Sequence, residues 1–209
     1  MNDFWENLYQ ENGALWEYYP SDSALIVLDL FQQNKLNKIL IPGIGYGRNA
    51  KPFIDEGFEV AGIEISQSAI KIAKKEFPTI KIFHGSLTKM PFNEELYDGV
   101  FCYATLHLFN ENERAQIINK CYNQLNINGL MFFNVISTDS LNDYTGKTMG
   151  QNLLKLENNL EVYFYNLEAV MKEFSNYNII DIYKIQEPIK HLQNQKPINC
   201  LNVICRKIF

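Results

Sequence analysis

Three glycines in an alternating pattern follow one apolar run of the sequence. An acidic residue stands at the end of the next apolar run. Gly43, Gly45 and Gly47 lie in the segment LIPGIGYGRN (residues 40–49). Glycines between a strand and a helix let a ligand approach the backbone closely, and the first turn of the helix offers unpaired N–H groups. Glu64 ends the second apolar run, where a carboxylate can accept both ribose hydroxyl protons. The pattern predicts a site for a nucleoside-containing cofactor.

Two classes of cofactor compete for this loop. A dinucleotide-binding loop reads GxGxxG, whereas here Arg48 occupies the position of the last glycine. An adenosyl cofactor without a diphosphate does not need that glycine. The spacing favours the adenosyl cofactor and leaves a nicotinamide-dependent oxidoreductase as the alternative.

Strands and helices that alternate along the chain must position these residues. Ser66 is a plausible N-cap of one helix, and Ser21 or Ser23 of another. The predicted strands are 38–42, 58–65, 79–85, 97–103 and 130–137. Helices are expected at 2–12, from the cap at Ser21 or Ser23 to about 33, and at 47–56, 66–77 and 111–125. Alternation of this kind predicts a parallel sheet with helices on both faces.

The alternation ends after Ser137. Residues 137–151 are polar and irregular, 159–165 could be a strand, and 167–174 are expected to be helical. Two late strands at 178–186 and 198–209 predict an antiparallel hairpin that closes the sheet.

Composition narrows the possible partners. The chain has 209 residues, 46% of them hydrophobic, and a formal net charge of -5, which argues against nucleic acid. The four cysteines form no C-x-x-C pair and the three histidines are scattered, so no metal site is expected. Apolar runs of membrane-spanning length are absent, and we expect a cytoplasmic protein with free thiols and no membrane partner.

Five short motifs, in order, resemble class I S-adenosylmethionine-dependent methyltransferases. They are PGIGYGRN, VAGIEIS, FHGSLTKMPF, YDGVFCYATLHLF and LNINGLMFFNV. The resemblance covers almost the whole chain. It implies one Rossmann-like α/β domain over 1–209, with a seven-stranded, mostly parallel sheet in the order 3-2-1-4-5-7-6. It also implies S-adenosylmethionine as the cofactor and S-adenosylhomocysteine as its product.

The N-terminal segments narrow the resemblance. FWENLYQ, LW and PSDSAL, ahead of LIPGIGYGRN, are similar to the thiopurine, thiol and tellurite-resistance branch of small-molecule methyltransferases. That branch implies methyl transfer to a small-molecule acceptor.

The motifs also imply which residues hold the cofactor. These are Gly43, Ile44, Gly45, Gly47, Glu64, Ile65, Ser86, Leu87 and Tyr103. Two positions depart from the family pattern: Ile41 replaces an acid before the first glycine, and Ser86 replaces an aspartate beside adenine. These departures leave open a protein that binds the cofactor without turnover.

Candidate residues for binding the methyl acceptor lie after the predicted strand 97–103 and near the N-terminus. A histidine of ordinary pKa can act as a base at neutral pH, so His107 is the candidate base, although a role in packing is favoured for it. The aromatic loop before Ser21 predicts a lid, so residues 1–20 are expected to form an N-terminal helix and lid, and 138–160 a substrate-side insertion. Arg48 could contact an anion of the substrate or the methionine carboxylate. The predicted acceptor-binding residues are Trp16, Tyr19, Arg48, His107 and Tyr165.

Overall fold

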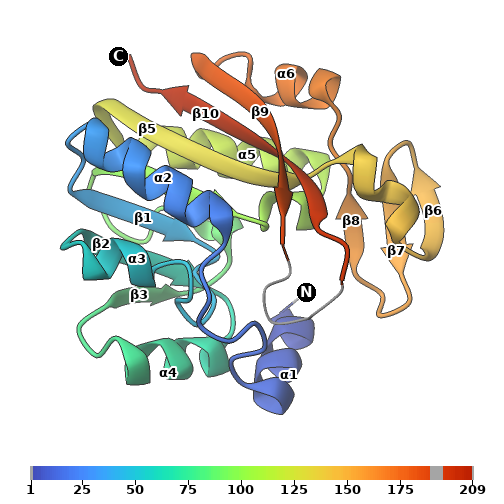
Figure 1. Ribbon diagram of the computed structural model, residues 1–209, viewed down its shortest axis with the longest axis horizontal. Coiled ribbons are helices and arrows are strands. Elements are labelled where there is room, and N and C mark those ends of the chain that lie inside the picture. Colours follow the sequence, from blue (N-terminus) through green and yellow to red (C-terminus); the bar gives the residue numbers. More distant parts are fainter. Residues whose placement is uncertain (1, 189–194, 209) are drawn as a thin grey trace.

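The structure is a computed structural model that describes residues 2–188 and 195–208. Its centre is a seven-stranded sheet made of β1 (Lys38–Pro42), β2 (Glu59–Glu64), β3 (Lys81–His84), β4 (Tyr97–Tyr103), β5 (Leu125–Ile136), β9 (Ile179–Glu187) and β10 (Ile198–Arg206). The strand order is β3-β2-β1-β4-β5-β10-β9 (Figure 1). β3, β2, β1, β4 and β5 run parallel, and β10 pairs antiparallel with β5 and β9. The predicted order and the C-terminal hairpin are confirmed.

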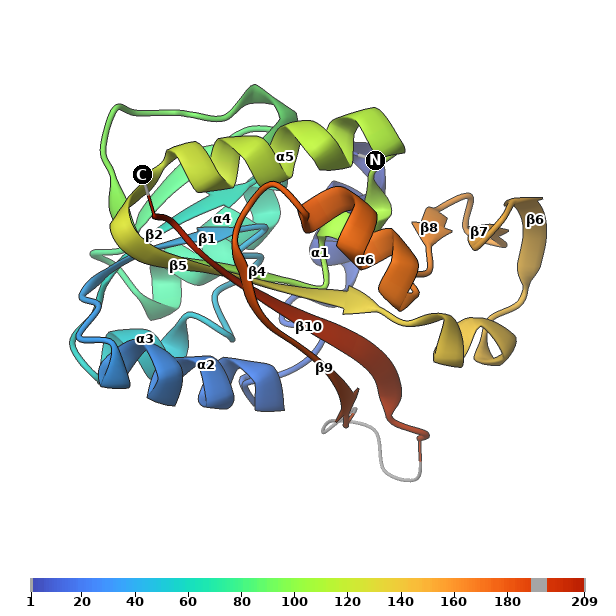
Figure 2. The same cartoon turned by 90° about the horizontal axis from the view of Figure 1, so that it is seen from above.

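Six α-helices accompany the strands in the described residues. They are α1 (Asn2–Asn12), α2 (Asp22–Gln33), α3 (Lys51–Asp55), α4 (Gln67–Glu76), α5 (Glu111–Asn123) and α6 (Leu167–Phe174). Three 3-10 turns, η1 (Leu87–Lys89), η2 (Leu106–Leu108) and η3 (Thr138–Asp143), follow the ends of β3, β4 and β5. Figure 2 shows α2 and α3 on one face of the sheet and α5 and α6 on the other.

Alternation along the central strands builds both cores. Phe101 of β4 and Phe132 of β5 point to the face covered by α2 and α3, where they stack with ring centroids 5.3 Å apart. Their chain neighbours Cys102 and Phe133 point to the face covered by α5 and α6. Successive side chains of a strand lie on opposite faces, so a strand covered on both faces is apolar throughout.

Helix starts follow their caps. The Ser66 side chain accepts a hydrogen bond from the N–H of Ala69 at the start of α4, as predicted. Ser21, rather than Ser23, caps α2 in the same way. The helix expected to begin near Gly47 begins only at Lys51, since residues 47–50 form turns and Gly47 has a φ of +89°. The glycine loop is therefore followed by a short helix of one turn and a half.

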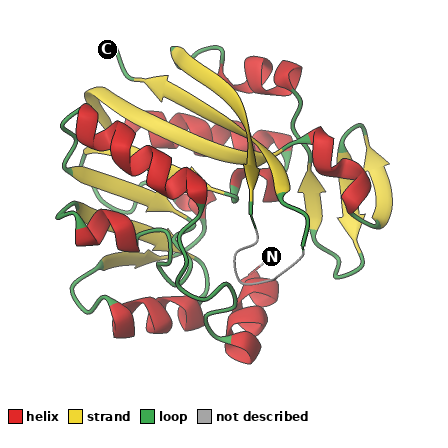
Figure 3. Ribbon diagram, in the orientation of Figure 1, coloured by secondary structure: helices red, strands yellow, loops and turns green. Residues whose placement is uncertain are grey.

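The segment after β5 holds a second, smaller sheet (Figure 3). It consists of β6 (Gly146–Gly150), β7 (Leu153–Leu156) and β8 (Glu161–Tyr163), in that order. The expectation of irregular structure over 137–151 was wrong for β6. All five residues of β6 are exposed, and the strand pairs with β7, so it carries no apolar alternation that a sequence pattern could reveal.

Some predicted features fall outside the described residues. Positions 189–194 of the link between β9 and β10, and residue 209 of the last predicted strand, are among them. Within the described residues, no helix is long and apolar enough to cross a membrane.

Gly62 of β2 lies directly beneath the glycine loop. A Cβ at this position would approach three side-chain atoms of Ile44 at 2.6 to 2.9 Å. We therefore expect Gly62→Ala to displace Ile44, to lower the free energy of unfolding by about 1–3 kcal/mol and to weaken cofactor binding. Urea denaturation and calorimetry measure the two effects. Gly150→Ala is the control, because no atom lies within 4 Å of a Cβ there. Equal stability of the two variants would contradict the close contact.

Candidate active site

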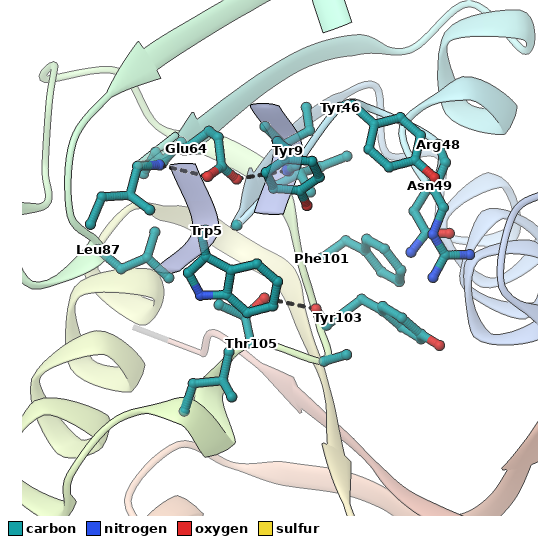
Figure 4. A pocket seen from close by; sticks show the side chains of 18 of the residues that line it. Trp5, Tyr9, Tyr46, Arg48, Asn49, Glu64, Leu87, Phe101, Tyr103 and Thr105 are labelled. Carbon is teal, nitrogen blue, oxygen red and sulfur yellow. Dashed lines mark hydrogen bonds between the residues drawn. The ribbon is translucent and has the colours of Figure 1, made fainter. Parts of the chain in front are cut away.

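A cavity of about 260 Å³ opens at the carboxyl ends of β1, β2 and β4 (Figure 4). The glycine loop after β1, the end of β2, the turn after β3 and the end of β4 form its floor and sides. Trp5 and Tyr9 of α1 and Trp16 of the following loop complete the lining. In open parallel sheets this edge is where ligands bind, because the loops that leave neighbouring strands diverge there.

The Glu64 carboxylate is the best-connected group in the cavity. Its Oε2 accepts the N–H of Gly45, and its Oε1 accepts the N–H groups of Ile65 and Ser66, each at 2.8 Å. The residue is only 6% exposed, and burial raises the pKa of its carboxyl against the opposing effect of these hydrogen bonds. A carboxylate offers about four lone-pair sites, so one site on Oε2 remains for a ligand hydroxyl. The sequence predicts acceptance from both hydroxyls of a ribose, whereas the structure leaves room for one.

Two of the predicted glycines allow close approach to the cavity. A Cβ at Gly43 would lie 2.5 Å from Oγ1 of Thr105, and one at Gly45 would lie 3.0 Å from the Tyr9 hydroxyl. Gly47 serves another purpose, because its Cβ would meet the ring of Phe77 at 3.0 Å and the residue is not part of the lining. Gly47 therefore lets the loop pack against the end of α4.

The remaining predicted cofactor residues come together at the cavity. Ile44 and Ile65 line it beside Glu64, and Ser86 and Leu87 line it from the turn after β3. Oγ of Ser86 lies 2.9 Å from Oγ1 of Thr88 and accepts the Thr88 N–H, so it is partly occupied within its own turn.

Aromatic side chains from α1 roof the cavity, and sequence reasoning underestimated them. Tyr9 is buried, and its ring centroid lies 6.0 Å from that of Tyr46 in the glycine loop. Trp16 stacks on Tyr46 at 6.4 Å and lies 6.3 Å from the Tyr9 ring, and the backbone N–H of Trp16 donates to the Tyr46 hydroxyl at 3.0 Å. The i, i+4 spacing of Trp5 and Tyr9 is also compatible with plain core packing. Only their contact with the glycine loop shows that they line the cavity instead.

A carboxylate fastens α1 to the rest of the fold. Glu6 accepts hydrogen bonds from the Ser66 hydroxyl at 2.7 Å and from the N–H and hydroxyl of Ser68 at 3.1 and 2.7 Å. The bonds from Ser66 and Ser68 lower the pKa of Glu6 to about 2. These partners lie in the first turn of α4, where unpaired N–H groups favour negative charge.

Arg48 and Tyr103 lie at the opposite end of the cavity from Glu64 (Figure 4). The Arg48 guanidinium carbon is 5.8 Å from the centroid of the Trp16 ring and 5.5 Å from that of Tyr103. One of its nitrogens donates to the backbone carbonyl of Tyr19 at 2.9 Å. Arg48, Trp16 and Tyr103, which the sequence predicts as site residues, thus lie together in one corner of the cavity.

His107 lies outside the lining, contrary to its predicted contact with the acceptor. Its Nδ1 accepts the N–H of Ile136 at 3.3 Å, and burial lowers its pKa to about 4. A neutral imidazole with Nδ1 as acceptor carries its proton on Nε2, so it has no free lone pair with which to take another. The geometry favours the packing role over that of a base.

Tyr165 and Tyr19 also differ from expectation. Tyr165 is fully buried away from the cavity, and its hydroxyl donates to Glu173 at 2.7 Å. The side chain of Tyr19 is 54% exposed and does not belong to the lining, and only its carbonyl takes part, through Arg48. Neither the exposure of an aromatic side chain nor the partner of its hydroxyl can be read from its residue type in a sequence.

Residues 39–129 match the family described as a methyltransferase domain. An uncharacterized methyltransferase of Oceanobacillus iheyensis is 26% identical over 186 residues, which cover 83% of this chain and 85% of the relative. The chain is a methyltransferase. This finding decides against the nicotinamide-dependent alternative, and it leaves the thiopurine, thiol and tellurite-resistance branch as a prediction.

Solved methyltransferases share the fold. One from Clostridium acetobutylicum has a TM-score of 0.73 at 11% identity, with 99% of each chain covered. The 1,6-didemethyltoxoflavin-N1-methyltransferase of Burkholderia thailandensis, solved with 1,6-didemethyltoxoflavin and S-adenosylhomocysteine, has a TM-score of 0.75 at 13% identity. That match covers 100% of this chain and 87% of the other. At these identities the likeness establishes the architecture of the methyltransferase and not its acceptor.

Glu64→Gln should weaken both the loop and the cofactor site. The amide nitrogen of glutamine would face a backbone N–H that now donates to a carboxylate oxygen, which costs about 1–3 kcal/mol of stability. We expect S-adenosylhomocysteine to bind roughly tenfold to hundredfold more weakly, as measured by calorimetry.

Two comparisons separate the effects of Glu64. Glu59→Gln, at the exposed start of the same strand, should leave binding unchanged. A 2′,3′-dideoxy analogue of S-adenosylhomocysteine should bind the parent enzyme more weakly than S-adenosylhomocysteine itself. Equal binding of the two ligands would remove the direct ribose contact and leave Glu64 with the loop alone.

Glu6→Gln should loosen α1. The pKa of Glu6 lies below its ordinary value of 4.5, so the attachment is fully present above that pH and is lost as the pH falls toward about 2. At pH 7 the variant should show faster amide hydrogen exchange throughout α1, while Glu11→Gln on the exposed side of the same helix should not. Identical exchange in both variants would show that the aromatic contacts alone hold the helix.

Proposed function

We propose that the methyltransferase transfers the methyl group of S-adenosylmethionine to a small-molecule acceptor. The observation that carries this proposal is the small size of the cavity, which extends from Glu64 to the corner of Arg48 and Tyr103 beside α1. A roofed cavity of about 260 Å³ suits small ligands better than a segment of a polymer.

The residues present fit the cofactor. The free lone pair of Glu64 suits a ribose hydroxyl, and Ile65, Ser86 and Leu87 offer a mostly apolar surface for a base. When bound, S-adenosylmethionine supplies a methyl group on a positively charged sulfur. The face of Tyr103 and the rings of the roof are suitable neighbours for such a cation, each contact being worth about 0.5–2 kcal/mol.

The protein contributes mainly alignment and the exclusion of water. Holding two reactants in line can supply roughly 7–11 kcal/mol of a barrier. α1 has the position required for both, because Trp5 and Tyr9 line the cavity while Glu6 fixes their helix to α4. We therefore infer that residues 1–20 serve as the lid of the site.

The segment 138–160 supports the acceptor side indirectly. Its described residues do not line the cavity. Leu154 and Val162 of the small sheet instead form a buried cluster against which Trp5, Phe109 and Ile198 pack, and these three side chains do line it. We infer that the small sheet braces the acceptor wall from behind.

Two observations bear on the finer assignment. The Burkholderia relative in fold is solved with 1,6-didemethyltoxoflavin, a small molecule. The N-terminal segments that resemble the thiopurine, thiol and tellurite-resistance branch include the roof residues Trp5 and Trp16. We propose a flat or thiol-bearing acceptor on this basis.

A screen tests the function directly. The purified enzyme with S-adenosylmethionine should release S-adenosylhomocysteine with at least one member of a panel of thiols, heteroaromatic amines and phenols. Calorimetry should show binding of S-adenosylhomocysteine and none of nicotinamide dinucleotides. Release that occurs only with a protein or a nucleic acid would overturn the small-molecule acceptor.

A further inference from the structure

We propose that the acceptor binds as an anion, with its negative group against the Arg48 guanidinium in the corner between Trp16 and Tyr103. The inference rests on the proposed function and adds the chemical class of the acceptor. It depends on two features of the lining as the structure describes it: a cation without a counter-ion, and the absence of a group that could remove a proton.

The first feature is the state of Arg48. In the described residues its side chain has no carboxylate within ion-pair distance, and one hydrogen bond, to the carbonyl of Tyr19, is its only one to a backbone group. Aromatic faces at 5.8 and 5.5 Å hold the guanidinium in place of a counter-ion. A guanidinium has five N–H donors in a fixed fork, so most of them remain for a planar anion such as a carboxylate.

Arg48 and Glu64 are the two charged residues among those described in the lining. The Glu64 carboxylate is already held by three backbone N–H groups and lies at the other end of the cavity. It therefore does not neutralise Arg48. An acceptor that brought no negative charge would leave this guanidinium facing an apolar, aromatic surface.

The second feature is the lack of a base among the described lining residues. Their other titratable side chains are Tyr9, Tyr46 and Tyr103, and burial raises the pKa of all three, that of Tyr46 to about 12. The hydroxyl groups of these three tyrosines therefore remain protonated at neutral pH. The neighbouring acids Glu17 and Glu187 and the thiol of Cys200 raise these pKa values further, and Arg48 opposes them. His107 lies outside the lining with Nδ1 occupied.

A thiol or phenol acceptor must therefore arrive already ionised, since no described lining residue is suited to remove its proton. A thiolate or an acidic phenolate meets this condition and also matches Arg48. The acceptor anion donates a lone pair to the methyl carbon, the carbon–sulfur bond breaks, and its electron pair returns to sulfur as a neutral thioether. No proton is released, and the positive and negative charges cancel.

This cancellation assigns a binding role to Arg48. The negative charge of the acceptor is largest before the transfer and declines in the transition state, so the guanidinium stabilises the bound acceptor at least as much as the transition state. Loss of Arg48 should accordingly raise KM and leave kcat nearly unchanged.

Binding to the complex with S-adenosylhomocysteine provides the first test. Benzoate and benzamide have the same shape and differ in charge, and calorimetry at pH 7 can compare them. We expect benzoate to bind at least about tenfold more tightly to the parent enzyme and this preference to vanish in Arg48→Gln. Lys51→Gln, which removes a nearby cation outside the lining, should retain it. Equal binding of the two probes, or no binding of either, overturns the proposal.

Two further measurements distinguish an acceptor contact from a cofactor contact and from a base on the enzyme. If Arg48→Gln weakens S-adenosylhomocysteine but not 5′-methylthioadenosine, which lacks the amino-acid carboxylate, the guanidinium serves the cofactor and the proposal fails. With thiophenols of graded acidity, the pH at which kcat/KM levels off should follow the ionisation of each thiol. A break at one common pH would reveal a base on the enzyme and overturn the proposal.

Failure of the anionic acceptor and failure of the proposed function would give different results. Methylation of neutral amines with a KM that Arg48→Gln does not change would leave small-molecule methyl transfer standing and remove the anionic acceptor. Absence of S-adenosylhomocysteine binding in the parent enzyme would instead remove the proposed function.

Discussion

The hydrogen bonds of the Glu64 carboxylate join the parts of the chain from which the cavity is made. One oxygen holds Gly45 of the loop after β1, and the other holds the turn that begins α4. A carboxylate that is 6% exposed is strongly destabilised by the loss of water unless such donors surround it. Burial and the hydrogen bonds thus depend on one another, and the position of the glycine loop depends on both.

The start of α4 receives a second carboxylate from the N-terminus. Glu64 takes the N–H of Ser66, while Glu6 takes the hydroxyl of the same residue together with both donors of Ser68. The unpaired donors of one helix end therefore attach the floor of the cavity and its roof to the same turn. This arrangement explains how a helix at the N-terminus, far from the motifs in sequence, becomes part of the site.

A buried ion pair supports the wall of the cavity that contains Phe109. Arg114 of α5 forms a forked interaction with Glu173 of α6 and donates to the carbonyl of Phe109, which lines the cavity. The rings of Tyr163 and Tyr165 lie 4.0 and 5.5 Å from its guanidinium carbon. A buried pair of this kind is costly to break, since either partner alone would be an uncompensated charge. Tyr165, expected in contact with the acceptor, is instead one of the groups that hold this pair.

Local patterns determined the parallel sheet, the glycine loop, the N-cap at Ser66 and the acid at the end of β2, because each depends on residues close together in the chain. The resemblance of the motifs supplied the strand order and the cofactor. Only the tertiary structure decided that Glu64 is largely occupied by backbone N–H groups, that His107 has no free lone pair, and that Arg48 has no counter-ion in the described residues. Two of the donors to Glu64, Ile65 and Ser66, are its neighbours in the chain, but the third donor, Gly45, and the surroundings of His107 and Arg48 come from distant segments. Residue type and spacing do not specify contacts between distant segments.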